Sequence, residues 1–154
     1  MKQQGTHGQL TNARETRAFL LGGRATVTLV GKENRYTYRV AACADKAGLW
    51  FVSVMYGSDN ESEYAYMGTL RTVDQGATVY QHGKKSKMSA NDKRSLAFAW
   101  TWDNLERGGR MPPGAEVWHD GRCCRCGRLL TVPESIKRGV GPECASKMFF
   151  AEAV

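Results

Sequence analysis

The chain has 154 residues, of which 42% are apolar, and 22 basic against 15 acidic side chains give it a formal charge of +7. This length suits one domain with a substantial core, or such a domain with a small appended module. No apolar run approaches the ~20 residues of a membrane-spanning helix, and the polar start lacks the apolar segment of a secretion signal. We therefore expect a soluble cytoplasmic protein with no membrane partner.

The first expected element is a short helix that follows a flexible segment at residues 1–10. Residues 11–15, Thr-Asn-Ala-Arg-Glu, combine a capping side chain with good helix formers. Residues 18–20 supply an apolar side, and the glycine pair at 22–23 ends the helix.

From residue 25 to residue 80 the apolar pattern changes to the two-residue period of β-strands. The expected strands are residues 25–30, 35–40, 49–56, 64–70 and a shorter one at 77–80. The third is the most apolar and is expected at the centre of the sheet. Loops of about four residues favour antiparallel neighbours, so the prediction is a meander of four or five strands.

The tyrosines of this region raise the question of an aromatic platform for unpaired bases. Such a platform would need basic neighbours on its own face. Tyr36 and Tyr38 alternate with Arg35 and Arg39, so a strand would put the two kinds of side chain on opposite faces. We therefore assign the tyrosines and Trp50 to the core.

A polar loop at residues 81–87 follows the sheet. Its lysines, Lys84, Lys85 and Lys87, are candidates for phosphate contacts, and a solvated loop is the alternative.

A long packed helix is expected next, opening at Ser89 with Asp92 three residues on and ending at the glycine pair 108–109. Its apolar side chains are spaced to form one broad buried face. They are Leu96, Phe98, Trp100, Trp102 and Leu105. Residues 111–114, Met-Pro-Pro-Gly, then predict a linker, and residues 115–118 are expected to form a short strand that leads to His119. The fold class is α+β, with a scaffold domain at 11–110 and a metal module at 115–154.

The module contains the clearest chemical pattern, formed by His119, Cys123, Cys126 and Cys144. Two thiols separated by two residues can bind one ion, because the turn between them brings both sulfurs to one side. Pro142 is suited to open a helix that carries Cys144, as in treble-clef zinc modules. Thiolate ligands select Zn(II) over magnesium or calcium.

The fourth ligand is open on spacing alone. His119 precedes Cys123 by four residues and is our prediction, with Cys124 and the other two histidines as alternatives. Cys124 adjoins one ligand and lies two residues from the other, where its sulfur would point away. Cys43 stands among alanines and is expected to be a small buried side chain.

Four protein ligands leave no open coordination position, so we expect a structural zinc, no enzyme activity, and loss of the fold of 115–150 when the metal is removed. If His119 were not a ligand, the open site would favour a zinc enzyme. Its candidate bases are Glu116, Asp120, Glu134 and Glu143.

Basic side chains surround the predicted zinc site, and most of the positive excess lies between residues 80 and 128. Such side chains can bind phosphate backbones, or serve only to keep a small module soluble. The candidates near the site are Arg122, Arg125, Arg128, Lys137 and Arg138. We expect a nucleic-acid or nucleoprotein partner.

These residues also carry a family resemblance. Residues 119–136, His-Asp-Gly-Arg-Cys-Cys-Arg-Cys-Gly-Arg-Leu-Leu-Thr-Val-Pro-Glu-Ser-Ile, and 139–145, Gly-Val-Gly-Pro-Glu-Cys-Ala, resemble the C-terminal module of a family of small uncharacterised bacteriophage and prophage proteins. Residues 10–20 and 60–69 resemble that family too, whereas Cys124 departs from its usual pattern. The resemblance implies a phage protein that acts in the host bacterial cytoplasm, without implying an activity.

Three hypotheses follow. The leading one is a non-enzymatic, zinc-stabilised phage accessory protein that binds nucleic acid or a nucleoprotein complex through the basic segment from Lys84 to Arg128. The second is a counter-defence inhibitor, similar in role to an anti-CRISPR protein, that acts by protein–protein contact. The third is a zinc-dependent hydrolase or deaminase.

Overall fold

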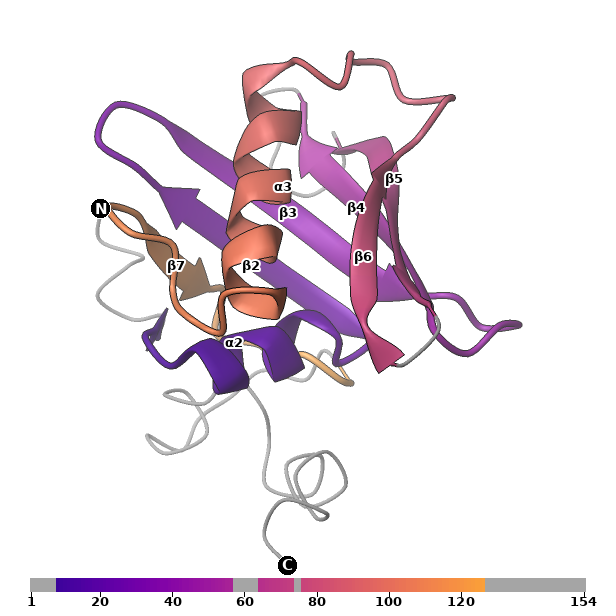
Figure 1. Cartoon of the computed structure of the whole chain (residues 1–154), viewed down its shortest axis with the longest axis horizontal. Helices are drawn as coiled ribbons and strands as arrows, with labels where there is room; N and C mark the ends of the chain where they lie inside the picture. Colours follow the sequence, from indigo (N-terminus) through magenta and orange to yellow (C-terminus); the bar gives the residue numbers. More distant parts are fainter. Residues whose placement is uncertain (1–7, 57–63, 74–75, 127–154) are drawn as a thin grey trace, which may run out of the picture.

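A computed structural model describes residues 8–56, 64–73 and 76–126 of the chain. Its described part is an α+β fold, with one seven-stranded antiparallel sheet and two helices (Figure 1). The strands are β1 (Gln9–Leu10), β2 (Arg24–Val30), β3 (Arg35–Ala42), β4 (Leu49–Met55), β5 (Tyr64–Thr72), β6 (Thr78–His82) and β7 (Glu116–His119). The helices are α2 (Ala13–Leu20) and α3 (Lys93–Glu106).

The sheet has the strand order β1-β7-β2-β3-β4-β5-β6. The run from β2 to β6 is the expected meander, but the expected total of four or five strands was too low. β1 is too short to show a periodic pattern, whereas β7 corresponds to the short strand expected at residues 115–118. Both join the sheet through contacts distant in sequence. Because both add to the β2 side, β3 occupies the centre instead of β4, which is one position away.

The N-terminal helix begins where the sequence predicts. The Asn12 side chain accepts a hydrogen bond from the Glu15 amide at 2.9 Å, which satisfies a free N–H group of the first turn of α2. Helix α3 begins later than expected, because its capping residue is Asp92 instead of Ser89. The Ser89 hydroxyl accepts from the Asn91 amide, within a turn that precedes the helix.

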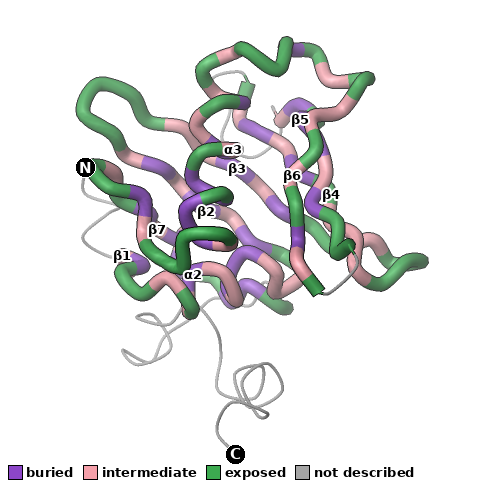
Figure 2. Tube along the Cα trace, in the orientation of Figure 1, coloured by how far each residue is buried: buried purple, intermediate pink, exposed green. Residues whose placement is uncertain are grey.

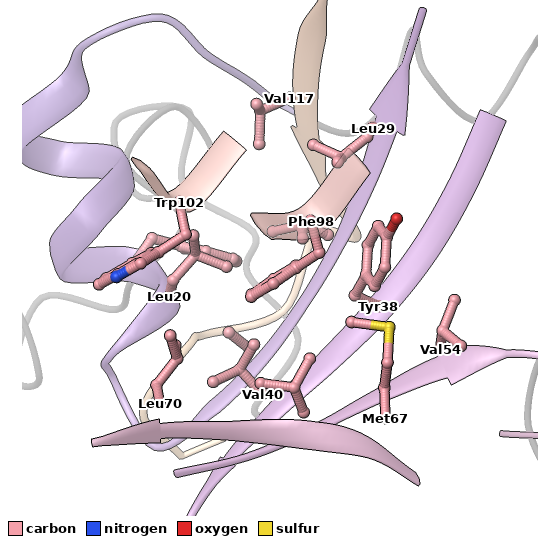
Figure 3. Packing of buried hydrophobic residues seen from close by; sticks show 14 of the residues in the cluster. Leu20, Leu29, Tyr38, Val40, Val54, Met67, Leu70, Phe98, Trp102 and Val117 are labelled. Carbon is pink, nitrogen blue, oxygen red and sulfur yellow. The ribbon is translucent and has the colours of Figure 1, made fainter. Parts of the chain in front are cut away.

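Both helices cover the same face of the sheet, and the core lies between them and the strands (Figures 1 and 2). Phe98 and Trp102 of α3 are buried, and the Phe98 ring lies 5.1 Å from that of Tyr38 on β3 (Figure 3). The Trp102 indole N–H donates to the Thr78 carbonyl at 2.8 Å. The polar atom of this large side chain is thereby satisfied inside the core.

The apolar face of α3 is narrower than expected. Phe98, Trp102 and Leu105 are buried, but Leu96 is 51% and Trp100 43% exposed. Each lies two residues from Phe98, which places it about 160° around the helix from that ring. Of the two tryptophans of α3, Trp100 is therefore a surface residue and Trp102 belongs to the core.

Strand β7 connects the predicted metal module to the sheet. It pairs with β1 and with β2, where His119 faces Val27, and the Val117 side chain is fully buried. Gln9 and Leu10, which fall in the segment expected to be flexible, form β1. The rest of the predicted module, from residue 127, lies outside the described residues, so its extent stays a prediction.

No helix of the described ranges is long and apolar enough to span a membrane.

Candidate metal centre and basic surfaces

His119 ends β7 and is almost fully buried, with its ring 5.5 Å from that of Phe19. Its Nδ1 accepts a hydrogen bond from the Gly121 amide at 2.9 Å. An amide can only donate, so the proton of the neutral imidazole is on Nε2. Zinc binding through Nε2 would need the other tautomer and would break the bond to Gly121, whereas binding through Nδ1 would replace that bond.

The cysteine turn follows directly. Cys123 is buried, and its sulfur accepts a hydrogen bond from the Arg125 amide at 3.4 Å, while Cys126 is exposed. An amide hydrogen two residues ahead of a cysteine stabilises negative charge on sulfur, and the thiolate is the form that binds metal. This local arrangement fits the knuckle that the C-x2-C spacing predicts.

Cys124, like Cys123, is buried in the hydrophobic core cluster, but it also packs against the turn that precedes β2. Its sulfur lies so close to Gly22 that a Cβ atom there would be 2.5 Å away. Its carbonyl accepts the Arg24 amide at 2.6 Å, which ties the knuckle to the start of β2. This position supports a packing role for Cys124 over a ligand role. Cys43, which was expected to be buried, is only partly buried.

The described residues supply only part of the predicted zinc site. Within residues 8–56, 64–73 and 76–126, no three His, Cys, Asp or Glu side chains lie close enough together to hold a metal ion. Cys144, the fourth predicted ligand, lies outside these ranges. The donor chemistry of Cys123 and Cys126 fits Zn(II), and the complete ligand set stays a prediction.

The two described candidate bases have structural contacts. The Trp118 indole N–H donates to the Glu116 carboxylate at 3.0 Å, and Asp120 accepts the Arg122 amide at 3.3 Å. Glu134 and Glu143 lie outside the described residues.

The predicted basic residues fall on two separate surfaces. One is the knuckle, residues 122–126, where Arg122 and Arg125 are exposed. The other, here called the lysine loop, is residues 83–87, in which all three lysines are exposed. Arg128, Lys137 and Arg138 lie outside the described part of the chain.

These surfaces lie toward opposite ends of the strands. The knuckle adjoins the first residue of β2, whereas the lysine loop leads toward the start of α3 (Figure 1). The lysine loop is anchored, since the Gly83 amide donates to the Met67 carbonyl at 2.9 Å and His82 Nε2 donates to the Met88 carbonyl at 2.9 Å. The continuous basic segment that the sequence suggests is thus divided in space.

A third surface carries tyrosines that the sequence pattern assigned to the core, and for these tyrosines that assignment was wrong. This surface is the open face, defined as the sheet face opposite α3, where Phe51 is 41% and Tyr66 37% exposed. Tyr64 shares this face and lies under the Arg39 guanidinium, 3.9 Å from the ring centre. Burial raises the pKa of Tyr64, and the charge of Arg39 partly offsets this effect.

A bulge in β5 explains why Tyr64 and Tyr66 lie on this surface instead of in the core. Tyr64, Tyr66 and the buried Leu70 are all at even positions, so a regular strand would place them on one face. The register shifts between Val52 and Ser53, where β5 has an extra residue, and this moves both tyrosines to the open face. Gly68 is the only sequence signal of the irregularity: a Cβ there would lie 2.4 Å from the Gln81 carbonyl oxygen.

Comparisons with known proteins concern the C-terminal part of the chain. Residues 115–149 match the model of a family of unknown function, DUF6011. This range contains β7, the knuckle and the position of Cys144, and it fits the expected resemblance to uncharacterised proteins. No curated protein matches the chain. No solved structure matches it either.

Proposed function

We propose that this is a non-enzymatic phage accessory protein that binds nucleic acid in the host cytoplasm, with Arg122 and Arg125 contacting phosphates. A zinc ion held by His119, Cys123, Cys126 and Cys144 would stabilise the knuckle and take no part in chemistry. The observation that carries the proposal is the pair of exposed arginines on a turn fixed to the sheet.

The fixed turn matters because binding costs conformational freedom. Cys123 and Cys124, which are consecutive residues of the knuckle, are both buried, and the Arg24 amide donates to the Cys124 carbonyl. The backbone of Arg122 and Arg125 is thus ordered before a ligand arrives, which lowers the entropy cost of a contact. A planar guanidinium can then bind one phosphate through two hydrogen bonds.

Anisotropy titrations with labelled DNA and RNA between 50 and 200 mM salt test the proposal. Each phosphate contact adds about 0.9 to the slope of log affinity against log salt. We expect Arg122→Gln with Arg125→Gln to lower that slope by about 2. The matched control, Lys32→Gln with Arg107→Gln, removes two exposed charges elsewhere and should lower it less. Absence of any binding at the lowest salt would reject the proposal.

A protein partner is the second candidate, favoured by the exposed Leu96 and Trp100 on α3. These side chains lie one helical turn apart and form an apolar stripe away from the core. If an inhibitor role is correct, a host protein should co-purify from nuclease-treated lysate with the wild type and not with Trp100→Ala. A partner that disappears with the nuclease would instead indicate nucleic acid.

A further inference from the structure

The open face is basic over most of its width. Following the alternation of strands β2 to β6, its positions include four arginines and no aspartate or glutamate among the described residues. Three of these arginines are Arg35, Arg39 and Arg71; the fourth is Arg24, whose guanidinium donates to the Cys126 carbonyl of the knuckle at 3.4 Å. The β7 side carries the acidic side chains of Glu116 and Asp120, and the charge of Asp120 acts as far as Tyr64 on β5. A polyanion would therefore be favoured over β3 to β6 and disfavoured near β7.

The same area presents aromatic rings to solvent. Phe51 on β4 and Tyr66 on β5 are neighbours, with ring centres 6.5 Å apart and an interplanar angle of 62°. Both are more than a third exposed, although burying such rings would ordinarily be favourable. Exposed rings flanked by arginines are the surface on which unpaired bases stack.

The lysine loop continues this surface. Gly83, its first residue, lies against Tyr66, and a Cβ at Gly83 would be 2.5 Å from Tyr66 Cε2. The absence of a side chain lets the loop backbone pass directly beside the ring. Lys84 and Lys85 follow at once and are exposed. A single-stranded nucleic acid with a base stacked on Tyr66 would thus have Lys84 and Lys85 within reach of its phosphates.

We infer that the open face, together with the lysine loop, binds single-stranded nucleic acid, with bases stacked on Phe51 and Tyr66 and phosphates contacted by arginines of the face and by Lys84 and Lys85. The inference rests on the proposed nucleic-acid function but uses a surface separate from the knuckle. A duplex does not fit this chemistry, because its base faces are already stacked within the helix.

The experiment compares four labelled probes of equal length: oligothymidine, oligouridine, an abasic strand and a duplex. Stacking requires bases, whereas phosphate contact does not. We expect wild-type protein to bind at least one of the two base-containing single strands roughly 5- to 100-fold more tightly than the abasic strand. Phe51→Ala and Tyr66→Ala should each reduce this ratio, with a greater loss in the double variant.

Trp100→Ala is the matched control, because Trp100 is 43% exposed against 41% for Phe51 but lies on α3, away from the open face. Phe51→Leu and Tyr66→Leu remove the rings while keeping apolar bulk, and they replace the alanine variants if those fail to fold. An unchanged ratio in the ring variants, or no preference for bases in the wild type, overturns the inference.

The knuckle variant separates this inference from the proposed function. Arg122→Gln with Arg125→Gln should weaken binding of all four probes and leave the base-dependent ratio intact. If only the ring variants affect binding, the open face is supported and the knuckle proposal fails. If only the knuckle variant does, the open-face inference fails.

Discussion

Gly22 and Cys124 show how one close contact positions the knuckle. The Cys124 sulfur and carbonyl oxygen occupy the space where a side chain at residue 22 would be, at 2.5 and 2.9 Å from an added Cβ. One of these atoms is backbone, so it cannot move away without displacing the bond to Arg24. A glycine is thus required here for close approach, and no left-handed backbone angle is involved.

We therefore expect Gly22→Ala to lower the free energy of unfolding by about 1–3 kcal/mol through overpacking. Urea denaturation followed by circular dichroism measures the change. Gly31→Ala is the control, because its nearest contact would be an ordinary 3.6 Å. Equal stability of the two variants would contradict the close packing of Cys124 on Gly22.

At the scale of one element, the start of α3 depends on Asp92. Its carboxylate accepts the Arg94 amide at 2.9 Å and two hydrogen bonds from the Arg94 guanidinium at 2.8 Å. These bonds lower the pKa of Asp92 to about 2; the bonds from the Arg94 guanidinium have the largest effect and the bond from the Arg94 amide the next largest. Arg94 also lies 4.9 Å from the Tyr56 ring, so the helix start is linked to the end of β4.

This lowered pKa predicts the sign of a pH effect. The folded-state pKa lies below the unfolded value of about 4, so Asp92 stabilises the fold at higher pH, and this contribution is lost as the pH falls from about 4 to about 2. Asp92→Asn keeps a capping side chain, so it should remove that part of the pH dependence. Asp92→Ala should in addition lose about 1 kcal/mol of capping at neutral pH.

Urea unfolding at neutral and acidic pH measures both effects. Asp103→Asn is the control, since Asp103 forms an exposed pair with Arg107 at 3.4 Å and should contribute under ~0.5 kcal/mol. If Asp92→Asn retains the full acid sensitivity of the wild type, the ion pair between Asp92 and Arg94 is not the cause of the loss of stability at low pH.

At the scale of the whole molecule, β7 makes the predicted metal module part of the scaffold. Four ladder pairs join β7 to β2, and Val117 is buried in the shared core. These contacts need no metal. The expectation that removing zinc unfolds all of residues 115–150 is therefore refined: β7 should stay in the sheet.

We expect a chelator to release one zinc ion per chain and to leave the near-ultraviolet circular dichroism of the buried Tyr38, Phe98 and Trp102 cluster unchanged. Hydrogen exchange should accelerate in the knuckle, at the Arg125 amide, more than in the β7 ladder. His119→Ala and Cys126→Ala should lose zinc, whereas Cys43→Ala should retain it. Metal-free wild-type protein as purified, or loss of the whole tertiary signal on chelation, would contradict this picture.

Local sequence determines much of this protein. Asn12 predicts the start of α2, the two-residue period predicts β2 to β6, and the spacing of Phe98, Trp102 and Leu105 predicts the buried side of α3. Each signal depends on neighbours a few residues away, so hydrogen-bond geometry and side-chain direction transmit it directly. The turn after Cys123 is of this local kind too, whereas the binding of one ion by the thiols of Cys123 and Cys126 stays a prediction.

Tertiary structure alone decided the rest. β1 has too few residues for a period, and the short strand expected at residues 115–118 does not reveal that β7 lies between β1 and β2 in the sheet. The bulge beside Gly68 moves Tyr64 and Tyr66 to the face that carries the arginines, which alternation along a regular strand would forbid. The lysine loop and the knuckle belong to the same basic part of the sequence. They lie far apart in the fold because α3, which connects them in sequence, runs along the strands between them. Register and chain direction are long-range properties, and no local pattern contains them.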